Sequence, residues 1–168
     1  TSPFAMTYDS WRHRNVVFGE AAGQSPQTWE YAPGALAQWT PGNAGCAGPQ
    51  GTPTLQPAAG SRPKLPSIFD LELNYGSGST AALLVFGLGR SPQSLGGLGM
   101  PGCVLDPSPD VTVLLQQSGG TAVFTWVLPN TSALNGIQVH AQGFVGDPAA
   151  NAAGALVSNE GTMLLGSV

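Results

Sequence analysis

Charged side chains are scarce in this sequence. Lys, Arg, Asp and Glu together make up 8% of its 168 residues, against about 25% in an ordinary soluble domain. Five residues are Lys or Arg, and the formal net charge at pH 7 is −4. Nucleic-acid binding needs clustered cations that neutralise phosphates, so this composition argues against it. No apolar run approaches the roughly 18 residues of a membrane span, so we expect no membrane-spanning segment.

Uninterrupted helical stretches are also missing. The chain contains 24 Gly and 15 Pro, and both residues destabilise the interior of a helix. This excludes a coiled coil or a helical bundle. Generic disorder is excluded as well, because 42% of the residues are hydrophobic and few are charged. The chain begins at Thr1 without a signal peptide, which indicates a processed or trimmed product.

No catalytic motif occurs. The serine-hydrolase elbow, the H-E-x-x-H zinc motif and a paired His-Cys arrangement are all absent from the sequence. Residues 97–102 match G-x-G-x-x-G, but no helix pattern follows them, so we interpret them as a loop. His140 alternates with glutamines and is expected on a solvated strand face. The sequence therefore predicts a protein that is not an enzyme.

The cysteines are two, Cys46 and Cys103, and each lies in a loop rich in Gly and Pro. Their separation of 57 positions matches no zinc-ligand spacing, which needs paired ligands a few residues apart. We predict that they form a disulfide, the alternative being two inert thiols. A disulfide indicates an oxidising compartment, so we expect an extracellular or cell-surface location.

Short apolar runs separated by turn residues fill the chain, which is the pattern of an all-β protein. In the N-terminal part the expected strands are residues 4–8, 15–19, 28–31 and 35–39. Residues 41–54 hold four Gly and three Pro and are interpreted as a linker. About eight further strands follow. We therefore predict a β unit at residues 1–40, a linker at 41–54 and a β-sandwich at 55–168.

Several strands of the second part can be placed by their patterns. Residues 69–75 alternate cleanly, which predicts one buried face and one polar face. Residues 111–116 and 121–128 flank a Ser-Gly-Gly turn and are predicted to form a hairpin. Residues 155–158 and 162–165 flank Asn159-Glu160-Gly161, which we interpret as a turn. The sandwich is expected to be of the Greek-key, immunoglobulin-like or jelly-roll kind.

The N-terminal part contains a series of short motifs: Tyr8-Asp9-Ser10, Arg12 and Arg14, Val16-Val17-Phe18-Gly19, Thr28-Trp29-Glu30-Tyr31 and Trp39. With these motifs, residues 5–40 resemble a Kelch repeat of secreted bacterial proteins. The resemblance implies one four-stranded propeller blade in which Trp29 and Trp39 belong to the core. One blade alone cannot bury both of its faces. We therefore expect this unit to rest on the sandwich, on another subunit or on further repeats.

The rest of the chain contains a second series of motifs: Gly45-Cys46, Leu83-Leu84-Val85-Phe86-Gly87-Leu88, Gly102-Cys103, Asp147-Pro148, Leu156-Val157-Ser158-Asn159 and Leu164-Leu165-Gly166. With these motifs, residues 41–168 resemble a C-terminal accessory domain of large secreted bacterial proteins. This resemblance implies a secreted or surface-exposed β-sandwich with a bridged cysteine pair.

Two groups of residues are candidates for binding. Trp11, Arg12, His13 and Arg14 combine an aromatic ring with basic side chains in a turn, which suits contact with a ligand or a partner protein. The loops that contain Asp106, Asp110 and Asp147 offer oxygen atoms to Ca²⁺, although their spacing lacks the regular pattern of a calcium loop. No other cofactor is expected.

Scarce charge leads to a prediction about function. Lys and Glu normally protect exposed sheet edges from pairing with other chains, and this chain has few of them. We therefore predict an extracellular structural protein that assembles with copies of itself through strand addition or sheet edges, as a polymer or filament. The alternative is a glycan- or surface-binding module from a larger secreted Kelch-propeller protein.

Overall fold

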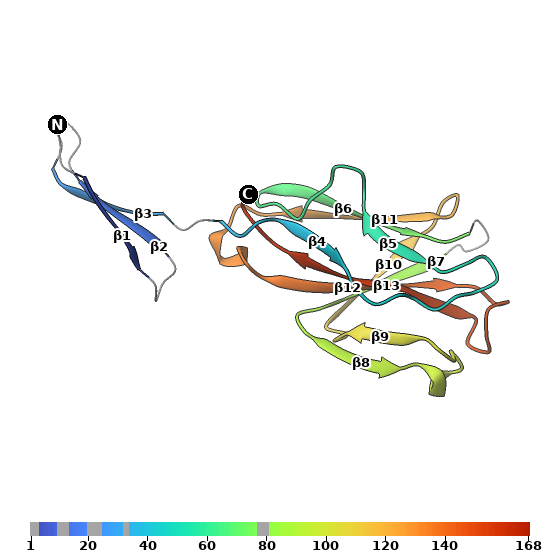
Figure 1. Ribbon diagram of the computed structural model, residues 1–168. Coiled ribbons are helices and arrows are strands. Elements are labelled where there is room, and N and C mark those ends of the chain that lie inside the picture. The colour runs from blue at the N-terminus through green and yellow to red at the C-terminus, as the bar shows by residue number, and fades with distance from the viewer. Residues whose placement is uncertain (1–3, 10–13, 20–24, 32–33, 77–80) are drawn as a thin grey trace. The chain divides into compact units, whose positions relative to one another are not determined.

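A computed structural model of the protein describes residues 4–9, 14–19, 25–31, 34–76 and 81–168. It divides the chain into two compact units, Thr1–Gly34 (unit 1) and Ala35–Val168 (unit 2). Strands dominate both units (Figure 1). In the described ranges the helical elements are two 3₁₀ turns, η1 (Gly96–Leu98) and η2 (Ser132–Leu134). The predicted all-β fold class is confirmed.

Unit 1 contains a three-stranded antiparallel sheet with the order β1-β2-β3. Its strands are β1 (Phe4–Asp9), β2 (Arg14–Gly19) and β3 (Gln27–Tyr31). The register places Met6 opposite Val17 and Val17 opposite Trp29. Because side chains of neighbouring paired residues point to the same face of a sheet, these three apolar residues form a row across one face.

Unit 2 is built from a five-stranded sheet, order β10-β7-β12-β13-β4, and a three-stranded sheet, order β11-β6-β5. A two-stranded β8-β9 ribbon lies beside the larger sheet (Figure 1). The strands are β4 (Gln38–Pro41), β5 (Thr54–Pro57), β6 (Ser67–Asn74), β7 (Ala81–Gly87), β8 (Arg90–Ser94), β9 (Val104–Pro107), β10 (Val111–Gln116), β11 (Thr121–Leu128), β12 (Gln138–Gly146) and β13 (Ala155–Leu164). Neighbouring strands are antiparallel throughout.

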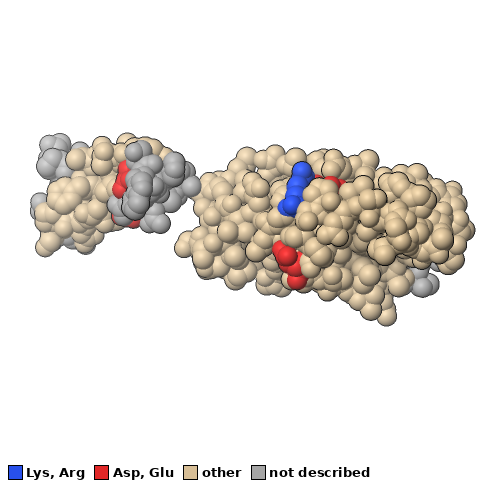
Figure 2. Space-filling model, turned by 90° about the horizontal axis from the view of Figure 1, so that it is seen from below, with Lys and Arg blue, Asp and Glu red and all other residues tan. Residues whose placement is uncertain are grey.

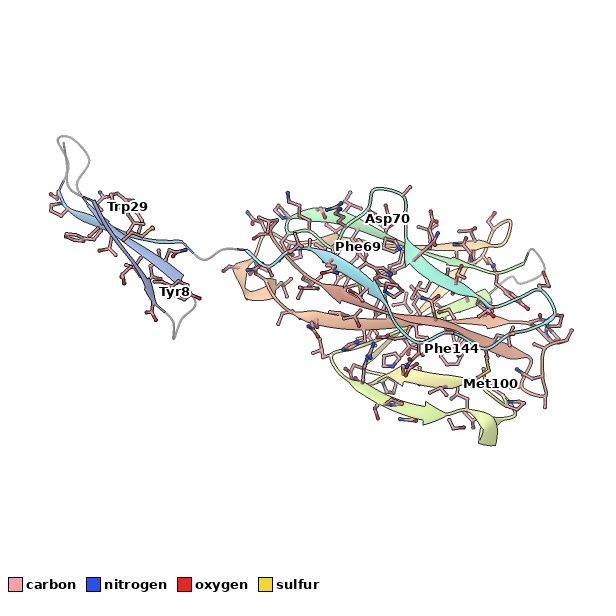
Figure 3. All side chains as sticks on the ribbon, viewed as in Figure 1. Tyr8, Trp29, Phe69, Asp70, Met100 and Phe144 are labelled. Atoms are coloured by element: carbon pink, nitrogen blue, oxygen red, sulfur yellow. A yellow bond between two sulfur atoms is a disulfide. The ribbon has the colours of Figure 1, made fainter. Side chains whose placement is uncertain are left out.

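The main core fills the space between the two larger sheets. On β6 the alternation read from the sequence is realised: Phe69, Leu71 and Leu73 are buried, and Asp70 lies on the other face (Figure 3). Gly143 of β12 faces this core without a side chain because Leu73 occupies the space that a Cβ would need. A close packing of sheet on sheet therefore explains a glycine inside a strand.

A second layer covers the other face of the five-stranded sheet. The β8-β9 ribbon crosses that face, and the loop that precedes β9 carries Met100 to the same side as Phe144 of β12 (Figure 3). A disulfide joins Cys46 to Cys103, with a Cα–Cα distance of 5.0 Å. The predicted bridge is confirmed. It connects the segment after β4 to the start of β9, so the covering layer is tied covalently to the rest of unit 2.

The segment expected to end the N-terminal unit belongs to unit 2 instead. The structure places the boundary at Gly34 rather than at residue 40. β4 pairs with β13 at the edge of the larger sheet, with Trp39 opposite Met163. Residues 41–54, expected as a linker, pack against unit 2 through Cys46, whose N–H donates to the carbonyl oxygen of Val157 at 3.1 Å. The fourth strand expected for a Kelch blade is thus part of the sandwich.

The turn expected at residues 159–161 does not form. β13 runs without a break from Ala155 to Leu164. The turn residues mark a register shift against β12, where Ser158 and Asn159 together oppose Gly143. The hydroxyl of Ser158 accepts a hydrogen bond from the N–H of Gly143 at 2.8 Å, which fixes this β-bulge.

The hairpin expected at residues 111–128 is wrong, although its turn is present. Ser118 and Thr121 exchange both backbone hydrogen bonds around Gly119 and Gly120. Both glycines have positive φ, as a tight two-residue turn requires. The strands then separate: β10 pairs with β7 in one sheet, and β11 pairs with β6 in the other. The turn therefore connects the two sheets of the sandwich.

Candidate functional site

An apolar groove of about 410 Å³ opens between β10 and β11. Each of these strands is the last one of its sheet, so the two sheet edges border the same opening. The wall of the groove includes Phe86, Phe124 and Trp126, whose ring centroids are 5.0 to 6.5 Å apart. Aromatic side chains of the core therefore reach the surface at this groove. One more strand, added beside β10 or β11, would cover them.

The two edge strands of this groove carry no protective charge. Neither Val111–Gln116 nor Thr121–Leu128 contains Asp, Glu, Lys or Arg. Val111 is 56% exposed and Leu114 is 69% exposed. Charged side chains also occupy only small areas on the face of unit 2 turned to the viewer in Figure 2. Uncharged, apolar edge strands are suited to pairing with another strand.

One acid, Asp110, stands at the rim of the groove. Its carboxylate accepts hydrogen bonds from the backbone N–H of Leu88 and the hydroxyl of Ser108, at 2.8 and 2.9 Å. These two bonds hold the pKa of Asp110 below its ordinary value. The carboxylate is thereby engaged within the chain and fixes the loops at one end of the groove.

Unit 1 exposes apolar side chains of its own. Met6 is 74% exposed, Tyr8 is 54% exposed and Trp29 is 40% exposed. By register these three side chains share one face of the β1-β2-β3 sheet. The expected place of Trp29 in the core of a blade stays a prediction. Trp39, expected as core as well, is half-buried and packs against the main core of unit 2.

A polar cluster surrounds the fully buried Glu160 of β13, on the face of the larger sheet that β8 and β9 cover. Arg90 of β8 donates two hydrogen bonds to its carboxylate, from Nε at 3.3 Å and from Nη2 at 2.5 Å. His140 Nδ1 lies 2.9 Å from Glu160 Oε1, and the hydroxyl of Thr162 donates to the same oxygen at 3.2 Å. Buried charge of this kind requires paired and hydrogen-bonded partners, and Glu160 has them.

His140 is buried, contrary to the expectation from the sequence. It was expected on a solvated face, but it is buried together with its strand neighbour Gln142. The alternation correctly placed both side chains on one face of β12. The alternation does not indicate that β9 covers this face of β12. The contact with β9 is direct, because Gln142 accepts a hydrogen bond from the N–H of Asp106 at 2.9 Å. Burial of a polar face depends on a contact between segments distant in sequence.

The calcium candidates lie in separate environments. Asp106 is buried and accepts a hydrogen bond from the side-chain amide of Asn43 at 2.9 Å. Asp110 is at the groove rim, and Asp147 accepts the hydroxyl of Tyr75 at 2.6 Å. In the described part of the chain, no group of three or more His, Cys, Asp or Glu is placed to hold a metal ion.

The turn with the basic and aromatic binding candidates lies mostly outside the described residues. Trp11, Arg12 and His13 fall outside the described residues, and of Arg14 only the backbone at the start of β2 is described. Their expected role in ligand or partner contact stays a prediction.

The pKa of Tyr75 provides a test of its buried hydrogen bond to Asp147. Burial raises its pKa above the ordinary value of 10.0, and the hydrogen bond to Asp147 adds to the shift. A tyrosine whose pKa is raised by folding stabilises the fold below pH 10, and this contribution is lost as the pH rises through the folded-state pKa. We expect one of the three tyrosines to titrate later than a free phenol in ultraviolet absorbance, and Tyr75→Phe to remove that step. Titration of Tyr75 near pH 10 would contradict the described contact.

These features define an all-β sandwich protein with an open apolar groove and a buried polar cluster. No protein-family model, curated protein or solved structure matches the chain. The two resemblances noted in the sequence therefore stay predictions. Within the described ranges, no helix has the length and the hydrophobicity to span a bilayer.

Proposed function

We propose that this protein is an extracellular or cell-surface structural subunit that assembles with copies of itself and performs no catalysis. One observation carries the proposal: two uncharged edge strands, β10 and β11, border an apolar groove lined by core aromatic side chains. Strand addition at such a site extends a sheet through main-chain hydrogen bonds and fills the groove with side chains. The disulfide supports a location outside the reducing cytosol.

The complementary surface is the apolar face of unit 1. A small sheet needs a hydrophobic face for independent stability, and in unit 1 the side chains of Met6, Tyr8 and Trp29 on this face are accessible to solvent. Unit 1 of one copy and the groove of the next are two different surfaces, so the contact is heterologous. Repetition of a heterologous contact gives a filament when the rotation between copies does not close a ring.

Sedimentation velocity over a wide protein concentration range tests this proposal. We expect the wild-type protein to form oligomers that grow with concentration. Val111→Lys places a charge on the groove wall and on the β10 edge, so we expect at least tenfold weaker self-association. On the donor surface, Met6→Lys is expected to have the same effect, because a charge in the apolar row opposes its burial.

Two matched variants separate the surfaces from a general effect of charge. Ile68→Lys changes a side chain of similar exposure, 62%, on the central strand of the smaller sheet. Ala5→Lys changes β1 on the face opposite Met6. Both are expected to assemble as the wild type does. A wild-type protein that stays monomeric at high concentration, or controls that weaken assembly equally, would overturn the proposal.

A further inference from the structure

A polar hollow of about 500 Å³ lies over the Glu160 cluster. It is lined by Thr40 of β4, Gln138 and His140 of β12, Thr162 of β13 and Arg90 of β8. The register sets Thr40 opposite Thr162 and Thr162 opposite His140, so these three side chains form a row across three strands. Val139 lines the groove and alternates on β12 with Gln138 and His140 of the hollow, so the hollow and the groove lie on opposite faces of this sheet.

Glu160 fixes the orientation of His140. The carboxylate accepts both hydrogen bonds of Arg90, as an ionised carboxylate does. An ionised carboxylate only accepts hydrogen bonds, so His140 Nδ1 carries the proton that it shares with Glu160 Oε1 over 2.9 Å. In the neutral ring, Nε2 then carries a lone pair, and no described residue donates to it. His140 thus presents a hydrogen-bond acceptor whose direction is set by a buried group.

The other groups of the hollow complete a mixed set of donors and acceptors. Arg90 uses Nε and Nη2 on Glu160, which leaves Nη1 as a donor. Gln138 offers an amide and Thr40 a hydroxyl group, whereas Thr162 lines the hollow with a hydroxyl that already donates to Glu160. The charge of Arg90 is balanced by Glu160, so with neutral His140 the lining has no net charge. A neutral lining with both donors and acceptors matches a ligand with many hydroxyl groups and no charge.

We propose that this hollow binds a neutral saccharide. The volume lies within the range of about 300–1,000 Å³ that small-ligand sites occupy. Side chains fixed by a buried carboxylate are already oriented, which reduces the entropy lost on binding. The saccharide hydroxyls donate to His140 Nε2 and accept from Arg90 Nη1 and from the Gln138 amide. This site is separate from the surfaces proposed for assembly.

The probes for the test are neutral hexasaccharides: maltohexaose, cellohexaose, chitohexaose and mannohexaose. Binding is followed by calorimetry and by the NMR signals of the His140 ring. We expect at least one probe to bind and to shift the His140 signals. Gln138→Ala and Thr40→Ala, which change exposed side chains, are each expected to weaken its binding at least tenfold.

The matched controls lie on β5, where Gln56→Ala and Thr54→Ala also change exposed side chains. Both are expected to bind the probe as the wild type does. A hexamer of galacturonic acid provides an anionic competitor and is expected not to displace the probe. The proposal is overturned if none of the neutral probes shifts the His140 signals, if Gln138→Ala and Thr40→Ala bind as tightly as the wild type, or if only the anionic hexamer binds. Sedimentation behaviour is independent of all three outcomes.

Discussion

Arg90→Met is expected to lower the free energy of unfolding by about 3 kcal/mol, as breaking a buried ion pair by removal of one partner does. The carboxylate of Glu160 is fully buried, and among the described residues that contact it Arg90 supplies the permanent positive charge. The half-exposed Arg90 side chain places the effect at the lower end of the range for buried pairs. Urea denaturation followed by circular dichroism measures it.

A second variant shows whether the unpaired charge is the cause. Arg90→Met combined with Glu160→Gln removes both charges and keeps an acceptor for His140 and Thr162. We expect this double variant to recover more than half of the stability lost in Arg90→Met. Arg62→Met, a change at an exposed arginine, is expected to stay within about 0.5 kcal/mol of the wild type. Equal losses in the single and double variants would show that the charge of Glu160 is not responsible.

Loss of the disulfide is expected to cost about 4 kcal/mol, the chain-entropy value for a closed loop of this length. Cys46 and Cys103 are 57 positions apart, so the bridge restricts a third of the unfolded chain. We expect Cys46→Ser/Cys103→Ser to unfold at a markedly lower urea concentration than the oxidised protein.

The reduced wild-type protein is the control for this variant. Its two thiols keep the size of the native side chains, so its stability separates loss of the covalent bond from loss of packing around the buried sulfur atoms. We expect reduction alone to give most of the effect. Identical urea midpoints for the oxidised and reduced wild type would contradict the entropic account.

Local patterns predicted the strands better than their partners. The alternation on β6 sufficed because one face meets the core and the other meets solvent. The Ser118 turn was recognised, but a turn does not specify whether the next strand stays in the same sheet. Asn159 and Gly161 are turn residues by composition, and here they accompany a bulge inside one long strand.

Recognition of the sites depended even more on topology. The lack of charge on β10 and β11 is visible in the sequence, but their common position on the two sides of one groove is not. Glu160 and Arg90 are 70 positions apart, and Arg90 gave no local sign of an ion pair. The paired cysteines were predictable because their number and their loops were informative without any knowledge of the fold.

The entry and exit of unit 2 determine how it responds to tension. Ala35 and Ser167 are hydrogen-bonded neighbours, and β4 leads away from this point beside β13. Tension between unit 1 and Val168 therefore opens the β4–β13 hydrogen bonds one after another, like a zipper, instead of loading them together. At Cys46 the disulfide transfers the force to Cys103, so residues 47–102 are shielded from extension. At about 3.5 Å per residue, the chain between Ala35 and Cys46 gives an extension of roughly 40 Å before the disulfide bears load, and the closed loop of residues 46–103 then stays folded back on itself.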